Sequence, residues 1–292
     1  MPALPVSEAP GNGRTVLVTG CSSGIGECVA RGLKVRGYRV FASARKPGDV
    51  ARLASEGLEA IEIDLSDGES IAHGARQVLE LSEGALYALF NNAGYGQPGA
   101  VEDLRTDVLR AQFETNFFGL HDLTCRVLPA MRARGEGRII QNSSVLGLVA
   151  MKYRGAYNAS KFALEGLTDT LRMELAGSGV HVSLIEPGPV RSRFRANAYA
   201  AFKRNIDVEA SAHREIYRAV ERRLANQTDE QPFTLPPSSV LDKVVHALES
   251  RRPKPRYYVT APTYALGFLR RVLSTRLLDL FLQGASRGEN RR

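Results

Sequence analysis

Two residues four positions apart, Tyr157 and Lys161, carry side chains that can together move a proton. On a helix this spacing places both of them on one face. The pKa of a free tyrosine is about 10, which is too high for easy proton exchange at neutral pH. A neighbouring ammonium favours the phenolate, so we expect Lys161 to lower the pKa of Tyr157. The pair predicts a general acid for reduction of a carbonyl group and a general base for the reverse oxidation.

A serine hydroxyl precedes this tyrosine by thirteen residues, at Ser144, just after the predicted strand 138–142. There it can donate a hydrogen bond to a substrate oxygen on which negative charge develops. Ser143 is the competing candidate. Taken alone, Tyr157 and Lys161 are more simply interpreted as a surface tyrosine and a solvated lysine. The catalytic interpretation is preferred because of the other motifs in the sequence.

A glycine-rich segment follows the apolar run 15–19, which predicts a buried parallel strand. Ser22 and Ser23 can cap the helix expected over residues 25–35, whose N-terminus offers N–H groups to a pyrophosphate. The spacing is G-x-x-x-G-x-G, not the common G-x-G-x-x-G, and an ordinary strand–helix turn is the alternative. The residues expected at the pyrophosphate are Gly20, Ser22, Ser23, Gly24, Ile25 and Gly26.

The second predicted strand, 38–44, indicates which dinucleotide would bind. A strand that serves NAD(H) usually ends in an acid that binds the ribose 2′-hydroxyl. Here it ends in Arg45 and Lys46, whose cationic groups suit a 2′-phosphate and favour NADP(H) over NAD(H). A solvated basic turn is the alternative.

Two further strand ends complete the predicted dinucleotide site. Asp64 and Leu65 follow the run 58–63, and an acid there can accept a hydrogen bond from an adenine amino group. Asn91–Gly94 follows the run 86–90 and combines small residues with amides that can tie a turn to its neighbours. The candidate cofactor contacts in these two segments are Asp64, Leu65, Asn92, Ala93 and Gly94.

In this order and at these spacings, the motifs resemble those of the short-chain dehydrogenase/reductase family over roughly residues 14–260. The matching motifs are Thr19–Gly26, Asn91–Gly94, Asn116, Ser144, Tyr157-x-x-x-Lys161 and Pro187–Gly188. The resemblance implies an enzyme that transfers hydride between a bound nicotinamide cofactor and a carbonyl or alcohol substrate.

The resemblance also implies roles for single residues. The thirteen-residue spacing selects Ser144 over Ser143, and Lys161 would reach the hydroxyls of the nicotinamide ribose. Asn116 matches the asparagine that holds a water molecule for proton relay. Ser192 stands where the family has a threonine that binds the carboxamide. The residues implied to line the nicotinamide pocket after the next strand are Pro187, Gly188, Val190 and Ser192.

The basic ending of the second strand and the basic C-terminal region most resemble the retinol and hydroxysteroid dehydrogenases and the bacterial NADP-dependent aldehyde reductases. That branch implies apolar substrates: medium- or long-chain aldehydes, retinal-like compounds or steroid-like ketones. Family members form homodimers or homotetramers through the helices that carry Asn116 and Tyr157. An NADP(H)-binding sensor and a membrane-associated interaction protein, neither with turnover, remain as alternative functions.

The 292 residues, 43% of them apolar, alternate predicted strands and helices. This pattern predicts an α/β fold: a single Rossmann-like doubly wound parallel sheet with helices on both faces. Further strands are expected over 183–190, where two prolines break the strand, and over 256–260, and a helix is expected over 238–250. The expected parts are a flexible arm (1–12), a catalytic domain (13–260) with a helical substrate lid (191–235), and a basic amphipathic extension (261–292).

The net charge of +8 is concentrated at the C-terminal end, because residues 191–292 hold 20 of the 39 Lys and Arg and 10 of the 31 Asp and Glu. One apolar helix with three arginines is expected over 264–283. It can pack on the body near the substrate entrance, pair with another subunit, or lie on an anionic membrane. Nucleic-acid binding is not expected, since the charge lies in a tail without a base-stacking motif.

Scattered cysteines and histidines indicate the compartment and argue against a metal. Three cysteines without C-x-x-C spacing indicate reduced thiols in a cytoplasmic protein, with peripheral membrane contact as an addition. The start of the chain lacks the pattern of a secretory signal, and no apolar run reaches the length of a membrane span. The five histidines show no metal-ligand spacing, so no metal is predicted.

Overall fold

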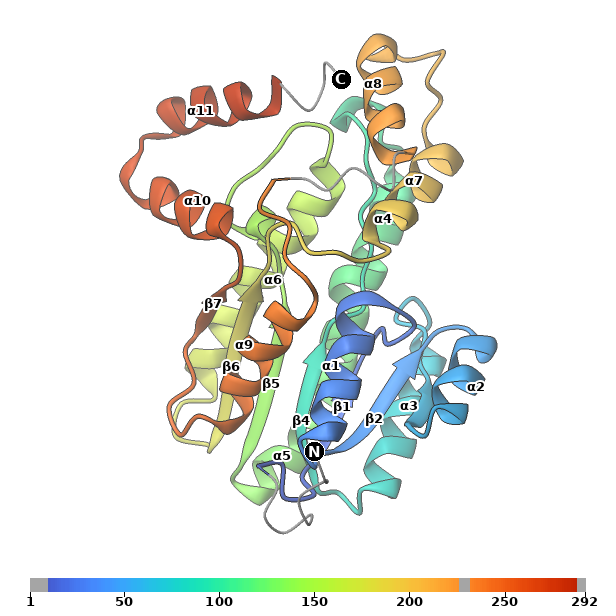
Figure 1. Ribbon diagram of the computed structural model, residues 1–292, viewed down its shortest axis with the longest axis vertical. Coiled ribbons are helices and arrows are strands. Elements are labelled where there is room, and N and C mark those ends of the chain that lie inside the picture. Colours follow the sequence, from blue (N-terminus) through green and yellow to red (C-terminus); the bar gives the residue numbers. More distant parts are fainter. Residues whose placement is uncertain (1–9, 226–231, 288–292) are drawn as a thin grey trace.

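The computed structural model describes residues 10–225 and 232–287. Within them, seven parallel strands form one sheet in the order β3-β2-β1-β4-β5-β6-β7. Parallel neighbours need crossover connections, and the helices that make them cover both faces of the sheet (Figure 1). The strands are β1 (Thr15–Val18), β2 (Arg39–Ala44), β3 (Glu59–Glu62), β4 (Leu86–Asn91), β5 (Gly137–Asn142), β6 (Val180–Glu186) and β7 (Arg256–Tyr258).

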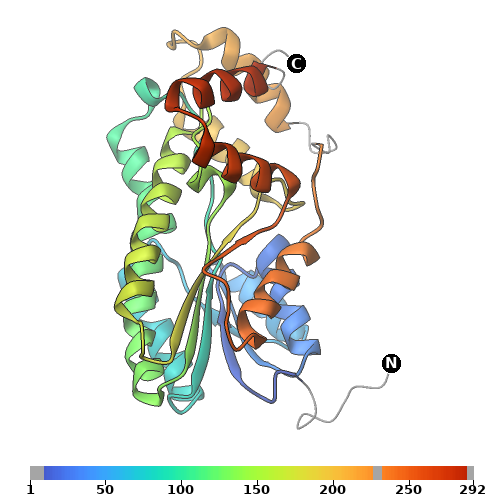
Figure 2. The ribbon, with the colours of Figure 1, turned by 90° about the vertical axis from the view of Figure 1, so that its left-hand side faces the viewer.

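The helices lie in two layers, seen on either side of the sheet in Figure 2. Strand β1 shows the reason: Val16 and Val18 face one hydrophobic cluster and Leu17 faces the other, because successive side chains point to opposite faces. The helices of the first two-thirds are α1 (Gly24–Val35), α2 (Pro47–Ser55), α3 (Gly68–Leu81), α4 (Thr106–Phe113), α5 (Gly119–Arg134) and α6 (Gly155–Glu174). Those after it are α7 (Phe194–Asn205), α8 (Arg214–Ala225), α9 (Ser238–Glu249), α10 (Ala261–Val272) and α11 (Thr275–Arg287).

The doubly wound parallel fold expected from the sequence is confirmed. The strand order reverses between β1 and β4, and ligands of such sheets bind outside the carboxyl ends of the strands at that point. The predicted strand 183–190 instead begins at Val180 and ends at Glu186, because Pro187 has no N–H to continue the ladder. The last strand is likewise shorter than predicted and ends at Tyr258.

The single helix predicted over 264–283 is wrong. The chain forms two helices, α10 and α11, because Leu273 takes an extended conformation between them (φ −91°, ψ 143°). Both helices pack against η3 (Val145–Gly147) and the residues after it, through a cluster that includes Val149, Leu278 and Leu282. The extension therefore packs on the body of the protein, above the carboxyl edge of the sheet (Figure 2).

The two segments expected to be mobile are only partly described. Of the predicted N-terminal arm 1–12, residues 1–9 lie outside the described residues. The rest is held in place, because Gly11 is buried and its N–H donates to the carbonyl of Arg36 at 2.9 Å. Of the predicted lid 191–235, residues 226–231 lie outside the described residues, and α7 and α8 pack together on the turn η1 (Val101–Asp103).

Candidate active site

The glycine loop after β1 has a shape that only glycine allows at two positions. Gly20 has a φ of +72°, and a Cβ there would lie 2.8 Å from the Cα of Ala93. A Cβ on Gly26 would lie 2.3 Å from the carbonyl oxygen of Gly20. Close packing of this kind lets backbone approach a pyrophosphate, so the loop fits a dinucleotide.

The expectation that Ser22 and Ser23 cap α1 is wrong. Ser23 occupies the N-cap position in extended conformation, but its side chain makes no cap hydrogen bond. The amides of the first turn of α1 are therefore not engaged by this hydroxyl, and an anion can use them. The carbonyl of Ser22 instead accepts a hydrogen bond from Nη2 of Arg52 at 2.9 Å.

A chain of hydrogen bonds connects the glycine loop to the predicted catalytic lysine. The Oγ1 of Thr19 accepts from the backbone N–H groups of Asn92 and Ala93, at 2.9 and 3.0 Å. The side-chain amide of Asn142 donates to Oδ1 of Asn92 at 3.0 Å. The Nζ of Lys161 donates to the carbonyl of Asn142 at 2.7 Å. Four elements, β1, β4, β5 and α6, thus fix the position of one ammonium group.

Sequence reasoning did not single out Thr19 or Asn142 as individual site residues. Their places at the ends of buried strands, next to polar turns, are the signal that could have indicated them.

Tyr157 and Ser144 are brought together as predicted, with the hydroxyl of Ser144 close enough to the phenol to favour its charged form. The hydroxyl of Ser144 also accepts from the N–H of Leu146 at 3.1 Å. Ser143 is buried and its hydroxyl has no partner in the described part of the protein. The geometry therefore favours Ser144 over Ser143 as the group beside the phenol.

The charge state of the Tyr–Lys pair differs from the expectation. Withdrawal from water raises the pKa of Tyr157 to about 12, and the hydroxyl of Ser144 only partly offsets this. Lys161 does not lower it, because its Nζ lies 5.7 Å from the centre of the ring and donates to Asn142. Burial lowers the pKa of Lys161 to about 8, against the opposing charge of Glu165.

The buried ammonium of Lys161 leads to a prediction on stability. Below about pH 8 this group is charged in both the folded and the unfolded chain. Withdrawal of the charge from water then destabilises the folded state in full. Between about 8 and 10.5 the unfolded chain holds more protons, so this group makes stability rise with pH. We expect Lys161→Met to abolish turnover, yet to gain stability relative to the parent by up to about 3 kcal/mol at neutral pH.

Urea unfolding of both proteins at several pH values measures this effect. The advantage of Lys161→Met should shrink as the pH rises from about 8 towards 10.5, the window set by the two pKa values. Lys152→Met, at an exposed position on the same segment, is the control and should show no such trend. A difference between Lys161→Met and the parent that is independent of pH would contradict the prediction.

Asn116 occupies a π-helical turn, η2 (Glu114–Phe118), between α4 and α5. Such turns are frequent at functional sites because they re-aim one side chain. The amide of Asn116 is fully buried and pairs with the backbone of Tyr95, accepting from its N–H at 3.1 Å and donating to its carbonyl at 2.9 Å. Its Nδ2 also lies 3.3 Å from Oγ of Ser160 on α6, next to Lys161.

The predicted lid reaches the site through Phe194, the first residue of α7. Its ring packs edge-to-face on the ring of Tyr157, with 5.2 Å between the ring centres. A Cβ on Gly96 would lie 2.7 Å from the tip of the same ring. A Cβ on Gly24 would lie 2.8 Å from Cβ of Ser192, so the loop before α7 also touches the glycine loop. Phe194 was one of several lid aromatics in the sequence, and nothing local distinguished it.

The remaining predicted contacts lie at the same edge of the sheet. Oδ1 of Asp64 accepts from the N–H and hydroxyl of Ser66, at 2.9 and 2.7 Å. The carbonyl of Pro187 accepts from Val145 at 2.8 Å, which joins the loop after β6 to the serine loop. Leu65, Gly94, Gly188 and Val190 lie in these same strand-end loops.

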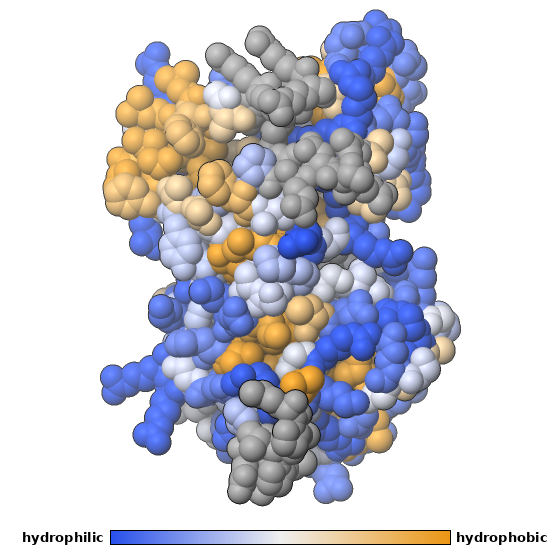
Figure 3. Space-filling model, in the orientation of Figure 1, coloured by the Kyte–Doolittle hydropathy of each residue, from blue (hydrophilic) through white to orange (hydrophobic). Residues whose placement is uncertain are grey.

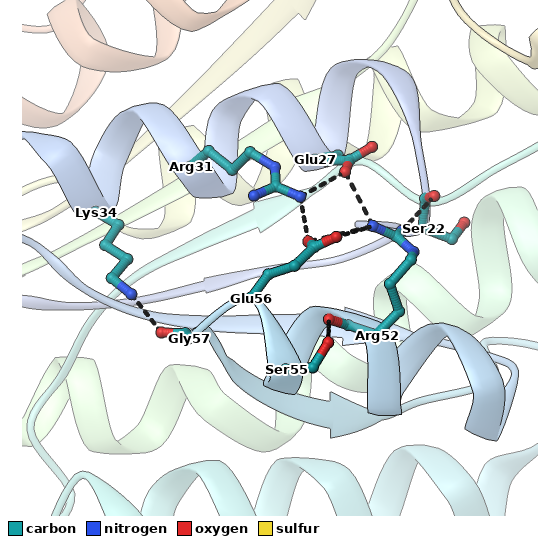
Figure 4. A network of polar contacts seen from close by, with 8 residues as sticks. All are labelled: Ser22, Glu27, Arg31, Lys34, Arg52, Ser55, Glu56 and Gly57. Carbon is teal, nitrogen blue, oxygen red and sulfur yellow. Dashed lines mark hydrogen bonds and ion pairs between the residues drawn. The ribbon is translucent and has the colours of Figure 1, made fainter.

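The basic end of β2 remains available to a ligand. Glu27 and Glu56, the nearby acids, are paired with Arg31 and Arg52 in a network that braces α1 against α2 (Figure 4). Arg45 and Lys46 are exposed, and neither makes an ion pair in the described part of the chain. Burial raises the pKa of Tyr95, and the positive charge of Arg45 opposes this rise. Arg45 is therefore close enough to act on a residue that contacts Asn116.

Comparison with known proteins agrees with this geometry. The pattern of the short chain dehydrogenases matches residues 14–202. The chain is 45% identical over 276 residues to "Uncharacterized oxidoreductase YbbO" of Escherichia coli K12, covering 93% of this chain and 94% of that protein. It is 34% identical over 255 residues to human retinol dehydrogenase 8, covering 82% and 79%. The chain belongs to the short-chain dehydrogenase/reductase family of oxidoreductases.

Solved structures extend the comparison to the cofactor. A short-chain dehydrogenase/reductase of Burkholderia phymatum in complex with NAD is 27% identical, with a TM-score of 0.74 over 93% of this chain and 95% of that one. One from Burkholderia cenocepacia in complex with NADP has the same fold, at 24% identity and a TM-score of 0.72 over 92% and 97%. The family binds a nicotinamide cofactor, and both forms occur within it.

Proposed function

We propose that this protein is an NADP(H)-dependent oxidoreductase that interconverts an apolar aldehyde or ketone and the matching alcohol. The observation that carries the proposal is the hydroxyl of Ser144 next to the phenol of Tyr157, with the buried ammonium of Lys161 beside the same ring. A proton donor next to a hydroxyl that can bind an oxygen is what acid/base catalysis at a carbonyl oxygen requires, and this supports the proposal.

Each of these residues has one proposed task. The phenol of Tyr157 gives its proton to the substrate oxygen in reduction and takes it back in oxidation. The hydroxyl of Ser144 binds the same oxygen as it gains charge. Lys161, whose ammonium is held at the carbonyl of Asn142, would bind the hydroxyls of the nicotinamide ribose, and Asn116 positions α6 through Ser160. The nicotinamide cofactor, when bound, supplies or accepts the hydride.

The proposed cofactor contacts follow from the fit of the glycine loop. The close-packed glycines and the first turn of α1 would hold the pyrophosphate, and the loops after β3, β4 and β6 would hold adenine and nicotinamide. Arg45 and Lys46 would bind the 2′-phosphate, which supports NADP(H) over NAD(H). The lid 191–235, with Phe194 on Tyr157, supports an apolar substrate, as does the similarity to retinol dehydrogenase 8.

We also propose that the protein is a homo-oligomer. Phe118 of η2 and Phe162 and Met173 of α6 are exposed apolar side chains, and they lie on the elements that carry Asn116 and Tyr157. Exposed apolar groups gathered on neighbouring helices are typical of subunit interfaces.

Oxidation of reduced cofactor tests the proposal directly. Purified protein is mixed with NADPH or NADH and a series of aldehydes, ketones and retinoids, and the loss of reduced-nicotinamide absorbance is followed. We expect turnover with NADPH, strongest for the apolar carbonyls. Tight NADPH binding without turnover on any member of the series would instead favour the sensor.

Arg45 provides the test of cofactor choice. Arg45→Ser removes a charge-assisted hydrogen bond to a 2′-phosphate, so kcat/KM for NADPH should fall by about ten- to a hundredfold. The value for NADH, which lacks this phosphate, should change little. Arg110→Gln, at an exposed position on α4, is the control and should leave both unchanged. Equal losses for NADPH and NADH would contradict the assignment.

A further inference from the structure

The two C-terminal helices expose a concentration of large apolar side chains. Among the residues that the structure describes, six of the fourteen exposed large hydrophobic side chains lie in α10 and α11, and they form an apolar area at the upper left of Figure 3. We call these six residues the C-terminal apolar face. They are Tyr264, Phe268, Val272, Leu277, Leu280 and Phe281.

This face is distinct from the side by which the same helices pack on the protein. Leu278 and Leu282 of α11 are 5% and 7% exposed and pack with Val149, while Leu266 and Leu269 of α10 are partly buried in the same cluster. Packing on one side therefore orders the helices, and the opposite side is left facing solvent. A monomeric soluble surface rarely keeps an apolar area of this kind without a partner.

The charges around the C-terminal apolar face are mostly positive. Arg270, Arg271 and Arg276 are exposed and make no ion pair within the described part of the chain. Asp279 is the one acid in the sequence of α10 and α11. Apolar side chains bordered by unpaired arginines are the combination that binds the surface of an anionic bilayer, where the apolar groups enter and the cations meet headgroups.

A second copy of the chain fits this face less well. A two-fold interface would place the face against itself and bring two sets of three arginines together with two aspartates to offset them. Like charges that meet across an interface oppose association. A bilayer with anionic lipid offers both an apolar phase and negative charge, so it complements both properties of the face.

We infer that the C-terminal apolar face docks the protein on the surface of an anionic lipid membrane. The contact is interfacial, since no described helix is long and apolar enough to cross a bilayer. Because α10 packs on η3, which begins directly after Ser144, docking would hold the substrate side of the enzyme close to the lipid. That last consequence rests on the proposed function; the docking itself does not.

Vesicle flotation of the full-length protein tests the inference. Vesicles of phosphatidylcholine alone are compared with vesicles that also contain phosphatidylglycerol, at low and high salt. The parent protein should float with the anionic vesicles, and high salt should weaken its binding. Phe268→Ser/Phe281→Ser should reduce partitioning by more than about tenfold. Arg270→Gln/Arg271→Gln/Arg276→Gln should reduce it by about a hundredfold, at roughly fivefold for each arginine.

Matched variants elsewhere on the surface separate this face from general stickiness. Val35→Ser/Leu81→Ser removes two exposed apolar side chains from α1 and α3, and Arg132→Gln/Arg251→Gln/Arg252→Gln removes three exposed arginines. Both controls should float like the parent. The inference is overturned if the parent does not float with anionic vesicles, if the controls lose binding equally, or if the face variants change only the oligomeric state. Flotation needs no turnover, so its failure is independent of the proposed reaction.

Discussion

Replacing Tyr157 by phenylalanine should lower kcat/KM for carbonyl reduction by about a thousandfold. The change removes one oxygen atom, and with it the proposed proton donor next to the hydroxyl of Ser144. The ring remains, so its edge-to-face packing with Phe194 should be kept and the fold should be undisturbed. Initial rates with NADPH and the best carbonyl substrate measure the effect.

The binding of cofactor distinguishes a chemical role of Tyr157 from a structural one. Titration of NADPH fluorescence should give the Tyr157→Phe variant a Kd close to that of the parent, because the lost group acts on the substrate oxygen. Tyr153→Phe is the matched control, since its hydroxyl lies nearby on the chain but contacts His213 at 3.3 Å instead of the serine loop. Its rate should stay within about tenfold of the parent. A Tyr157→Phe enzyme as fast as the Tyr153→Phe enzyme would remove Tyr157 from the mechanism.

The sequence predicted the sheet well because its signals are local. The central strands β1 and β4 are short apolar runs that end in a polar turn, a pattern typical of parallel strands because both of their faces are buried. The ends of the strands were less predictable. Strand β7, for example, ends at Tyr258, before the end of the predicted strand 256–260. Pro187 has no N–H to continue the ladder, and it ends β6 at Glu186, as the prolines of this segment indicated.

The sequence contains a local signal for the break between α10 and α11, but the helical periodicity of the leucines favoured a continuous helix. Leucines at three- and four-residue steps continue through Leu273, and this continuity favoured one long helix. Ser274 and Thr275, however, are typical of a helix start, and the carbonyl of Ser274 accepts from Leu278 at the beginning of α11. Two helices can each turn an apolar side to the surface around η3, which one straight helix cannot.

The details of the site depended on contacts between distant residues. The π-helical turn aims Asn116 at Tyr95, and the lid places Phe194 on Tyr157 from 37 positions along the chain. The pKa of Tyr157 was predicted with the wrong sign because spacing reveals a neighbouring lysine but not the loss of water around the phenol. Burial is a property of the whole fold, so it could not be read from four residues of a helix.

A second large effect is expected at Arg256, where the last strand of the sheet meets α6. Its guanidinium binds Glu165 and Asp169 of α6, the latter at 2.5 Å, and Glu186 of β6 at 2.8 Å. Glu186 is fully buried, and burial raises its pKa to about 8. Arg256→Met would leave these carboxylates without their cation and should cost about 3–5 kcal/mol of unfolding free energy at neutral pH.

The pH dependence of this loss follows from the buried acid. In the parent, the guanidinium of Arg256 favours the charged form of Glu186. Without Arg256, the pKa of Glu186 in the folded state should therefore rise further. Above the ordinary value of 4.5 the unfolded chain then releases its proton while the folded chain keeps it, so the stability of the variant falls as pH rises. The parent loses stability in the same way up to its own folded pKa of about 8, so urea unfolding should show a deficit, relative to the parent, that grows only as the pH rises above about 8.

Two further variants distinguish the loss of stability caused by a buried, unpaired charge from the loss caused by breaking an exposed ion pair. Arg39→Met breaks an exposed pair with Glu59 on the opposite half of the sheet, and should cost less than about 1 kcal/mol. Arg256→Met/Glu186→Gln removes the buried acid and should recover the part of the deficit that appears above about pH 8. Because Glu165 lies one helical turn after Lys161, the Arg256→Met variant should also lose activity in step with this loss. If it were as stable as Arg39→Met, Arg256 would not be what holds α6, and with it the Tyr–Lys pair, against the sheet.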